Sequence, residues 1–238
     1  MVATDQDDRT PGSRCDGRPN AMTALVIGAR TDSSTSAVSA RRFAARVSTH
    51  DVLFVAGVYK TGTSLAVDLC VRAGYRDPSG ETNPGERGYG SSLTRYVTHE
   101  CKVLRQVNDR LLTRHDRVAR VRRASPESYL LEWGCPIVLK DPRFIFTLPR
   151  WISAARRLGH EPGVIFSHRP RDELVTAWEV APFTSDLLMQ NRLGAYLASF
   201  QERLAWCLRA GVPHIVISLE ELRRIDRAWP PLTWARRL

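Results

Sequence analysis

The feature that most constrains this chain is a short apolar run followed at once by a glycine-containing loop and a helical pattern. Residues 52–56 (VLFVA) are apolar and end in turn residues, which is typical of a buried parallel strand. Residues 57–64 (GVYKTGTS) form the loop, and residues 63–73 have helical spacing of apolar side chains. Such a junction aims main-chain N–H groups and the positive end of a helix dipole at one point. We therefore expect it to bind a phosphate-like anion.

The residues of the loop suit an anion, but their order differs from the Walker A pattern G-x-x-x-x-G-K-[ST]. Gly62 lets the main chain approach a ligand closely, and Lys60 adds a full positive charge. Gly57 and Gly62 have the Walker A spacing, but Lys60 precedes the second glycine. Threonine stands where that pattern has its lysine. Further donors are the hydroxyl groups of Thr61, Thr63 and Ser64.

The rest of the chain alternates between predicted strands and helices. Further strands are expected at residues 136–139, 163–167 and 214–218, and helices at residues 93–123, 151–158, 191–210 and from residue 174. This order predicts an α/β fold with a parallel sheet and helices on both faces. Residues 51–238 are expected to form this domain. Residues 1–50 are expected to be a poorly ordered extension that holds a short strand at 24–28 and a short basic helix at 37–47.

Two more segments carry charged residues directly after a predicted strand. Lys140-Asp141-Pro142-Arg143 follows the second strand, and His168-Arg169-Pro170-Arg171 follows the third. Open parallel sheets bind their ligands outside the carboxyl ends of their strands, so both segments are candidate ligand contacts. The alternative is a charged turn after a strand in the first segment and an arginine-rich helix start in the second.

Together the three segments resemble those of sulfotransferases that use 3′-phosphoadenosine 5′-phosphosulfate (PAPS) as sulfuryl donor. Residues 58–65 (VYKTGTSL) resemble their 5′-phosphosulfate loop, [PY]-[KR]-S-G-T-[ST]. Residues 137–151 (IVLKDPRFIFTLPRW) are similar to the K-D-P-R segment of bacterial sulfotransferases. Residues 164–178 (VIFSHRPRDELVTAW) resemble the 3′-phosphate site, R-x-P-x-x-x-x-x-S, with histidine at the arginine position and threonine at the serine position. The resemblance implies a three-layer P-loop NTPase-like fold.

The resemblance also implies a role for each matching residue. Lys60 and Lys140 would be the catalytic cations, and no metal is required. Arg169 and Thr176 would bind the 3′-phosphate, with Arg171 or His168 as substitutes. The 5′-phosphosulfate would be bound by the loop residues Tyr59, Lys60, Thr61, Gly62, Thr63 and Ser64.

The general base is the least defined member of the implied site. Many sulfotransferases have a glutamate in the loop after the first helix, and Glu81 lies 21 residues after Lys60. Glu86 is the second candidate and His99 a third. The acceptor would be a hydroxyl or amine of a small molecule, carbohydrate or lipid.

Two other classes of protein are alternatives to a sulfotransferase: nucleic-acid binders and P-loop kinases or NTPases. The net charge of +10 suggests nucleic-acid binding, but the basic residues are scattered and no recognition module is present. Only three of the 35 basic residues are lysines. A P-loop kinase or NTPase remains an alternative, as does a nucleotide-binding homologue without activity.

Residues 1–20 lack the apolar stretch of a secretory signal, and no C-x-x-C pair or membrane-spanning run is present, so we expect a cytoplasmic protein.

Overall fold

The centre of the fold is a sheet of four parallel strands in the order β2–β1–β3–β4. The computed structural model describes residues 33–79, 101–112, 125–179 and 193–229, and these belong to one unit that spans residues 32–238. The strands are β1 (Val52–Gly57), β2 (Ile137–Lys140), β3 (Pro162–His168) and β4 (His214–Ser218). The chain runs from β1 to its neighbour β2 and then crosses to β3 on the other side of β1. The order therefore reverses at β1.

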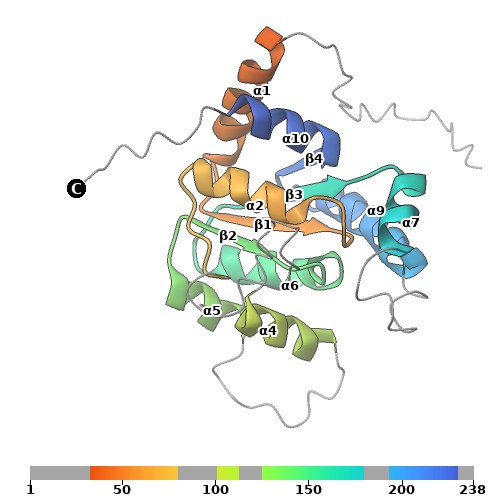
Figure 1. The fold of residues 1–238 in the computed structure, drawn as a ribbon. Coiled ribbons are helices and arrows are strands. Elements are labelled where there is room, and N and C mark those ends of the chain that lie inside the picture. The colour runs from red at the N-terminus through yellow and green to blue at the C-terminus, as the bar shows by residue number, and fades with distance from the viewer. Residues whose placement is uncertain (1–32, 80–100, 113–124, 180–192, 230–238) are drawn as a thin grey trace, which may run out of the picture. The chain divides into compact units, whose positions relative to one another are not determined.

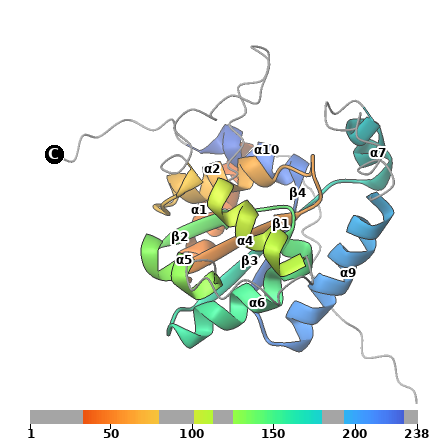
Figure 2. The same cartoon turned by 90° about the horizontal axis from the view of Figure 1, so that it is seen from below.

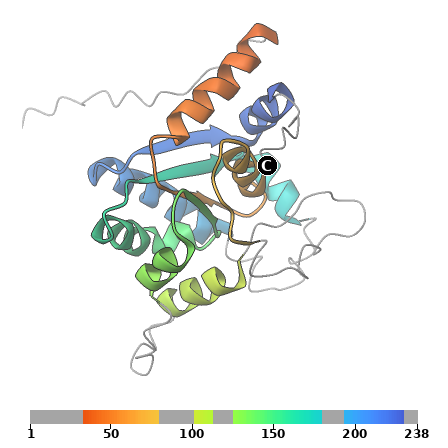
Figure 3. The same ribbon diagram turned by 90° about the vertical axis from the view of Figure 1, so that its left-hand side faces the viewer.

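Helices cover both faces of the sheet (Figures 1 and 2). One face carries α1 (Ser33–Val47), α2 (Thr63–Arg72) and α10 (Leu219–Ala228), and Figure 3 shows α1 and α10 side by side. The helices on the opposite side are α4 (Lys102–Leu112), α5 (Pro126–Trp133), α6 (Phe144–Arg157), α7 (Arg171–Glu179) and α9 (Leu193–Arg209). Among the helices in the described ranges, none is both long and apolar enough to cross a membrane.

Strand β1 is apolar throughout because both of its faces are covered. Its side chains alternate, so Phe54 belongs to the core beneath α6 while Leu53 and Val55 belong to the core beneath α2. On the α6 face, the ring centroids of Phe54, Phe144 and Trp151 lie 5.3 to 6.1 Å apart. These packed rings fix β1 at the centre of the domain.

The helices of the other face are joined by apolar packing and one ion pair. Leu69 of α2, Leu222 of α10 and Phe43 of α1 are buried in one core cluster. The Arg72 guanidinium of α2 lies 2.7 Å from the Asp226 carboxylate of α10. Helix α2 is therefore held between the sheet and α10.

The four expected strands are confirmed, as are the α/β class and the parallel sheet. The helices expected at 37–47, 63–73, 151–158, from residue 174 and at 191–210 are also present, and α6 begins earlier than expected, at Phe144. Of the helix expected at 93–123, α4 is present, and residues 93–100 and 113–123 lie outside the described residues. Two features differ. Helix α5 is an additional helix, and α1 extends the folded domain to include residues 33–50, because Ala40, Phe43 and Val47 are buried. The expected strand at 24–28 lies outside the described residues.

Candidate functional site

The loop after β1 leaves the sheet at the strand where the order reverses. Ligands of open α/β sheets bind outside the carboxyl ends of the strands at such a point. Lys60 has a left-handed φ of 70° and Gly62 has a φ of 94°. A positive φ is uncommon for a residue other than glycine, so Lys60 marks a specialised main-chain conformation. Turns of this kind direct successive N–H groups toward one side and form anion-binding concavities.

Thr61 is buried beneath this loop, with 1% of its surface exposed. Its Oγ1 donates a 2.7 Å hydrogen bond to the carbonyl of Val58, and its main-chain N–H donates to the same carbonyl over 3.3 Å. Its Oγ1 also lies 3.0 Å from Oγ of Ser167 at the end of β3. The expectation that the Thr61 hydroxyl donates to an anion does not fit this arrangement, because its one hydrogen is already donated within the loop.

The first turn of α2 begins at Gly62, and no side chain in the described ranges caps it. A Cβ at Gly62 would come within 2.7 Å of the Leu219 side chain and 3.2 Å of the Leu222 side chain. Glycine is thus required both by its φ and by the close approach of α10. Thr63 is buried and Ser64 is half-buried at the same helix start. An uncapped helix N-terminus keeps main-chain donors available to an anion.

Tyr59 packs into an aromatic cluster. Its ring meets Trp178 of α7 and Tyr196 of α9 edge to face, with centroids 6.0 and 5.9 Å apart. These contacts tie the loop to the helices on the α6 side. Tyr59 therefore has a structural role in addition to its predicted contact with the nucleotide.

Lys140 ends β2 beside the loop strand. It stands opposite Val55 of β1 in the register, and 5% of its surface is exposed. The Asp141 carboxylate accepts hydrogen bonds from the main-chain N–H and the Nη1 of Arg143, over 2.8 and 3.2 Å. The Arg143 Nε also lies 2.6 Å from the Asp109 carboxylate of α4. Burial alone would lower the pKa of Arg143, but the charges of Asp141 and Asp109 raise it above its ordinary value.

The third predicted segment begins at the end of β3, where Ser167 stands opposite Gly57 in the register. Burial lowers the pKa of His168, which favours its neutral form. The Arg169 Nε donates to the Glu173 carboxylate over 3.0 Å, and this arginine is 21% exposed. Thr176 is exposed on α7 and donates its hydroxyl to the carbonyl of Asp172 over 3.1 Å.

The parallel sheet thus brings three of the predicted segments to one edge: the loop 57–64, Lys140 and the turn after β3. Glu81, Glu86 and His99 lie outside the described residues, so their role as base stays a prediction. In the described ranges, no group of three or more histidine, cysteine, aspartate or glutamate side chains could hold a metal ion.

Sequence reasoning missed Ser167 and the pairing of Arg143 with Asp109. Ser167 is fully buried and directly follows the apolar residues 164–166. A polar residue at the end of a predicted buried strand was the sequence signal that could have identified it. The Arg143–Asp109 pair has no sequence signal, because helix α4 is distant along the chain.

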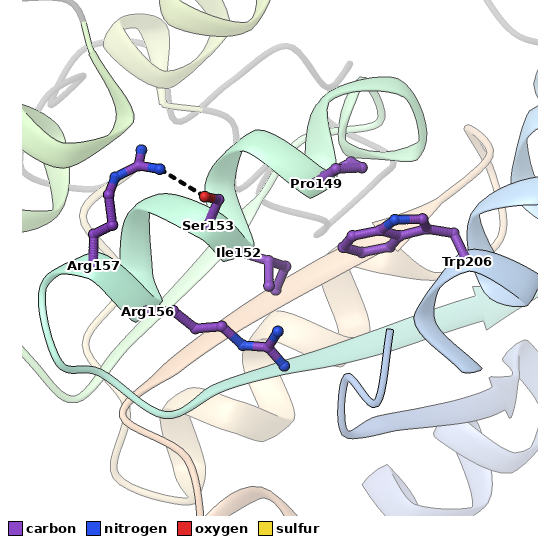
Figure 4. Close-up of a pocket in the computed structure, with 6 residues that line it drawn as sticks. All are labelled: Pro149, Ile152, Ser153, Arg156, Arg157 and Trp206. Atoms are coloured by element: carbon purple, nitrogen blue, oxygen red, sulfur yellow. Dashed lines mark hydrogen bonds between the residues drawn. The ribbon is translucent and has the colours of Figure 1, made fainter. Parts of the chain in front are cut away.

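A cavity of about 330 Å³ lies away from this edge (Figure 4). It is formed by α6 and α9, and its lining residues are Pro149, Ile152, Ser153, Arg156, Arg157 and Trp206. The Arg157 guanidinium donates to Ser153 over 2.6 Å and pairs with Glu127 of α5. The Arg156 Nη2 donates to the carbonyl of Gly211 over 3.4 Å, so both arginines of this cavity make contacts within the protein.

Comparisons with models of known families, with curated proteins and with solved structures found no match to this chain. The residues at the carboxyl edge of the sheet therefore carry the functional inference.

Proposed function

We propose that this chain is a PAPS-dependent sulfotransferase of the P-loop NTPase-like fold. The observation that carries the proposal is the adjacency of β1 and β2, which brings the loop with Lys60 and the buried Lys140 to the same sheet edge. The strand order also reverses at β1, the strand that this loop follows. Two of the three lysines, in a chain whose other 32 basic residues are arginines, supply compact positive charges beside an anion-binding loop.

Sulfuryl transfer needs little covalent chemistry from the protein. The acceptor oxygen attacks sulfur while the bond from sulfur to the bridging oxygen of the nucleotide breaks, and negative charge grows on the leaving oxygen. Catalysis is therefore mainly positioning and cationic stabilisation, as in phosphoryl transfer. In this proposal the amides of the loop bind the 5′-phosphate, and Lys60 and Lys140 stabilise the charge of the leaving oxygen and of the sulfuryl group.

The remaining roles follow from the motifs. Arg169 and Thr176 are proposed to bind the 3′-phosphate, with Arg171 as the nearest alternative. The neutral form favoured by His168 makes it the weaker substitute. Glu81 is proposed to accept the proton of the acceptor hydroxyl, and Glu86 is the second candidate. The acceptor is a hydroxyl or amine of a small molecule, carbohydrate or lipid.

A P-loop kinase or NTPase is the second candidate, and one contact weighs against it. Such enzymes need an acidic side chain for Mg²⁺ near the phosphates. Asp141 is the acidic residue at the end of β2, but its carboxylate accepts two hydrogen bonds from Arg143. A carboxylate neutralised in this way is a poor magnesium ligand.

Calorimetric titration separates the two candidates. The protein is titrated with adenosine 3′,5′-bisphosphate without magnesium, and with ATP plus magnesium. The sulfotransferase proposal predicts that the bisphosphate binds more tightly and that its affinity does not depend on magnesium. Preference for ATP plus magnesium would contradict the proposal and favour the kinase or NTPase.

A further inference from the structure

The buried contact between Thr61 and Ser167 joins the loop after β1 to the neighbouring strand β3. The two hydroxyl oxygens are 3.0 Å apart, although the residues are far apart in the sequence. Thr61 is 1% exposed and Ser167 is fully buried. In such an environment a hydrogen bond is strong and an unsatisfied hydroxyl is costly.

The direction of this hydrogen bond follows from counting hydrogens. A threonine hydroxyl has one hydrogen, and Thr61 donates it to the carbonyl of Val58 over 2.7 Å. The Thr61 oxygen therefore accepts from Ser167, so Ser167 is the donor of the pair. The result is a chain of two hydrogen bonds that runs from Ser167 of β3 through Thr61 to the carbonyl of Val58 in the loop.

Gly57 leaves the space in which this pair meets. A Cβ at Gly57 would lie 2.6 Å from the Ser167 hydroxyl oxygen and 2.7 Å from the Thr61 hydroxyl oxygen. Any larger residue would push the two hydroxyl groups away from the end of β1. The strand end, the loop and β3 are therefore packed against one another at a single point.

Thr61 stands between two residues with left-handed main-chain conformations, Lys60 at 70° and Gly62 at 94°. For a residue such as lysine this conformation is unfavourable and persists only where the surroundings hold it. The hydrogen bonds of Thr61 fix the main chain between Lys60 and Gly62.

We propose that Ser167 is a positioning residue of the nucleotide site. By donating to Thr61, it holds the loop in the conformation that directs Lys60 and the amides at the start of α2 toward the 5′-phosphosulfate. Ser167 itself does not touch the nucleotide. This inference rests on the proposed function, and it assigns to Thr61 the role of an internal support.

The test compares Ser167→Ala with Thr147→Ala. Thr147 is a matched control because it is also buried and its hydroxyl donates to Asn108 over 2.8 Å, but it lies within α6. Ser167→Ala should weaken the binding of adenosine 3′,5′-bisphosphate by about 3- to 10-fold, as expected for the loss of one hydrogen bond. Thr147→Ala should lower the unfolding temperature and leave this affinity unchanged.

Variants of Thr61 separate positioning from a general loss of stability. Thr61→Ser keeps the hydroxyl and should lose less affinity for the bisphosphate than Thr61→Val. Thr61→Val removes the hydroxyl, so adding Ser167→Ala to it should weaken binding no further. Additive losses of affinity in the double variant would contradict the proposed chain of hydrogen bonds.

Hydrogen exchange tests, without any ligand, whether Ser167 holds the loop in place. The Thr61 amide, which donates to the Val58 carbonyl, should exchange about 3- to 10-fold faster in Ser167→Ala than in Thr147→Ala. If the wild type binds the bisphosphate and Ser167→Ala binds it equally well, the inference is wrong and the proposed function stands. If the wild type does not bind it, the proposed function fails, and equal exchange rates in the two variants would then overturn the positioning of the loop.

Discussion

Arg203 of α9 donates a hydrogen bond from Nε to the main-chain carbonyl of Ile145 in α6, over 3.0 Å. Pro149 lies four residues after Ile145, inside α6, and has no N–H to donate to that carbonyl. The arginine of one helix therefore replaces the donor that proline removes from the other. The Arg203 guanidinium also lies 5.8 Å from the ring centroid of Trp206.

Replacing Arg203 should therefore destabilise the protein in a way that depends on Pro149. Arg203→Met should lower the free energy of unfolding by about 1–3 kcal/mol, because it leaves the Ile145 carbonyl without a donor. In a Pro149→Ala background, the new alanine N–H supplies that donor, so the same substitution should cost less. Urea unfolding of the four proteins measures both effects. Equal losses in the two backgrounds would show that Arg203 acts only through Trp206.

Gly62→Ala should destabilise the protein more than the same substitution at Gly74. Both glycines have a positive φ, 94° and 102°, so both variants lose about 1–2 kcal/mol from main-chain strain. The Cβ at Gly62 also meets Leu219, whereas no atom lies within 4 Å of a Cβ at Gly74. We expect about 1–3 kcal/mol of additional loss at Gly62 in urea unfolding. Equal losses would mean that α10 does not press on the start of α2.

His50 should make the protein less stable in mild acid. Its ring packs against Gly163, and burial lowers its pKa while the charges of Glu161 and Asp51 partly oppose the shift. The unfolded state therefore binds a proton more readily than the folded state, starting at about pH 6.5. This contribution to stability is complete above that pH and is lost as the pH falls through it toward the lower pKa of the folded state.

The measurement is the urea midpoint of wild type and His50→Gln between pH 5 and 8. The decrease of the urea midpoint below pH 6.5 should be smaller in the variant. Near pH 8 the difference between the midpoints of the two proteins should no longer change with pH. His168, whose pKa is also lowered by burial, accounts for part of the decrease that remains. Parallel curves over the whole range would contradict the role assigned to His50.

Lys140→Arg should lower turnover even though it keeps the charge. Lys140 is 5% exposed, and the wide guanidinium needs more room than the ammonium that it replaces. We expect a loss of about 10²-fold in kcat, comparable to the removal of one group that stabilises charge in a transition state. The assay is transfer from radiolabelled PAPS to an acceptor found by screening. Full turnover in Lys140→Arg would show that a compact cation is not needed.

Much of the fold could be predicted because the buried strands are apolar and the residues between them break or begin helices. The runs 52–56 and 163–167 show this directly, and both are strands. Helix α5 was missed because eight residues are too few for a clear helical period, although its start signals are present. Ser125 caps it by accepting from the Ser128 N–H over 3.2 Å, and Pro126 follows the cap.

The predicted site was less complete because its contacts depend on strand register. A parallel sheet explains why the loop, Lys140 and the turn after β3 meet at one edge. Nothing in the sequence shows that Gly57 stands opposite Ser167, or that the Thr61 hydroxyl turns inward to Val58. Those features arise from tertiary packing around one glycine, and in our proposal they make Thr61 a support of the loop instead of an anion ligand.

The affinity of three proteins for adenosine 3′,5′-bisphosphate tests the central claim most directly. They are the wild type, Lys60→Met and Lys102→Met, titrated by calorimetry without magnesium. Lys102 is the matched control, because it is the one lysine of the chain that belongs to none of the three motifs. The account predicts that Lys102→Met binds like the wild type and that Lys60→Met binds at least about tenfold more weakly. Equal affinity in all three proteins, or no binding by the wild type, would contradict it.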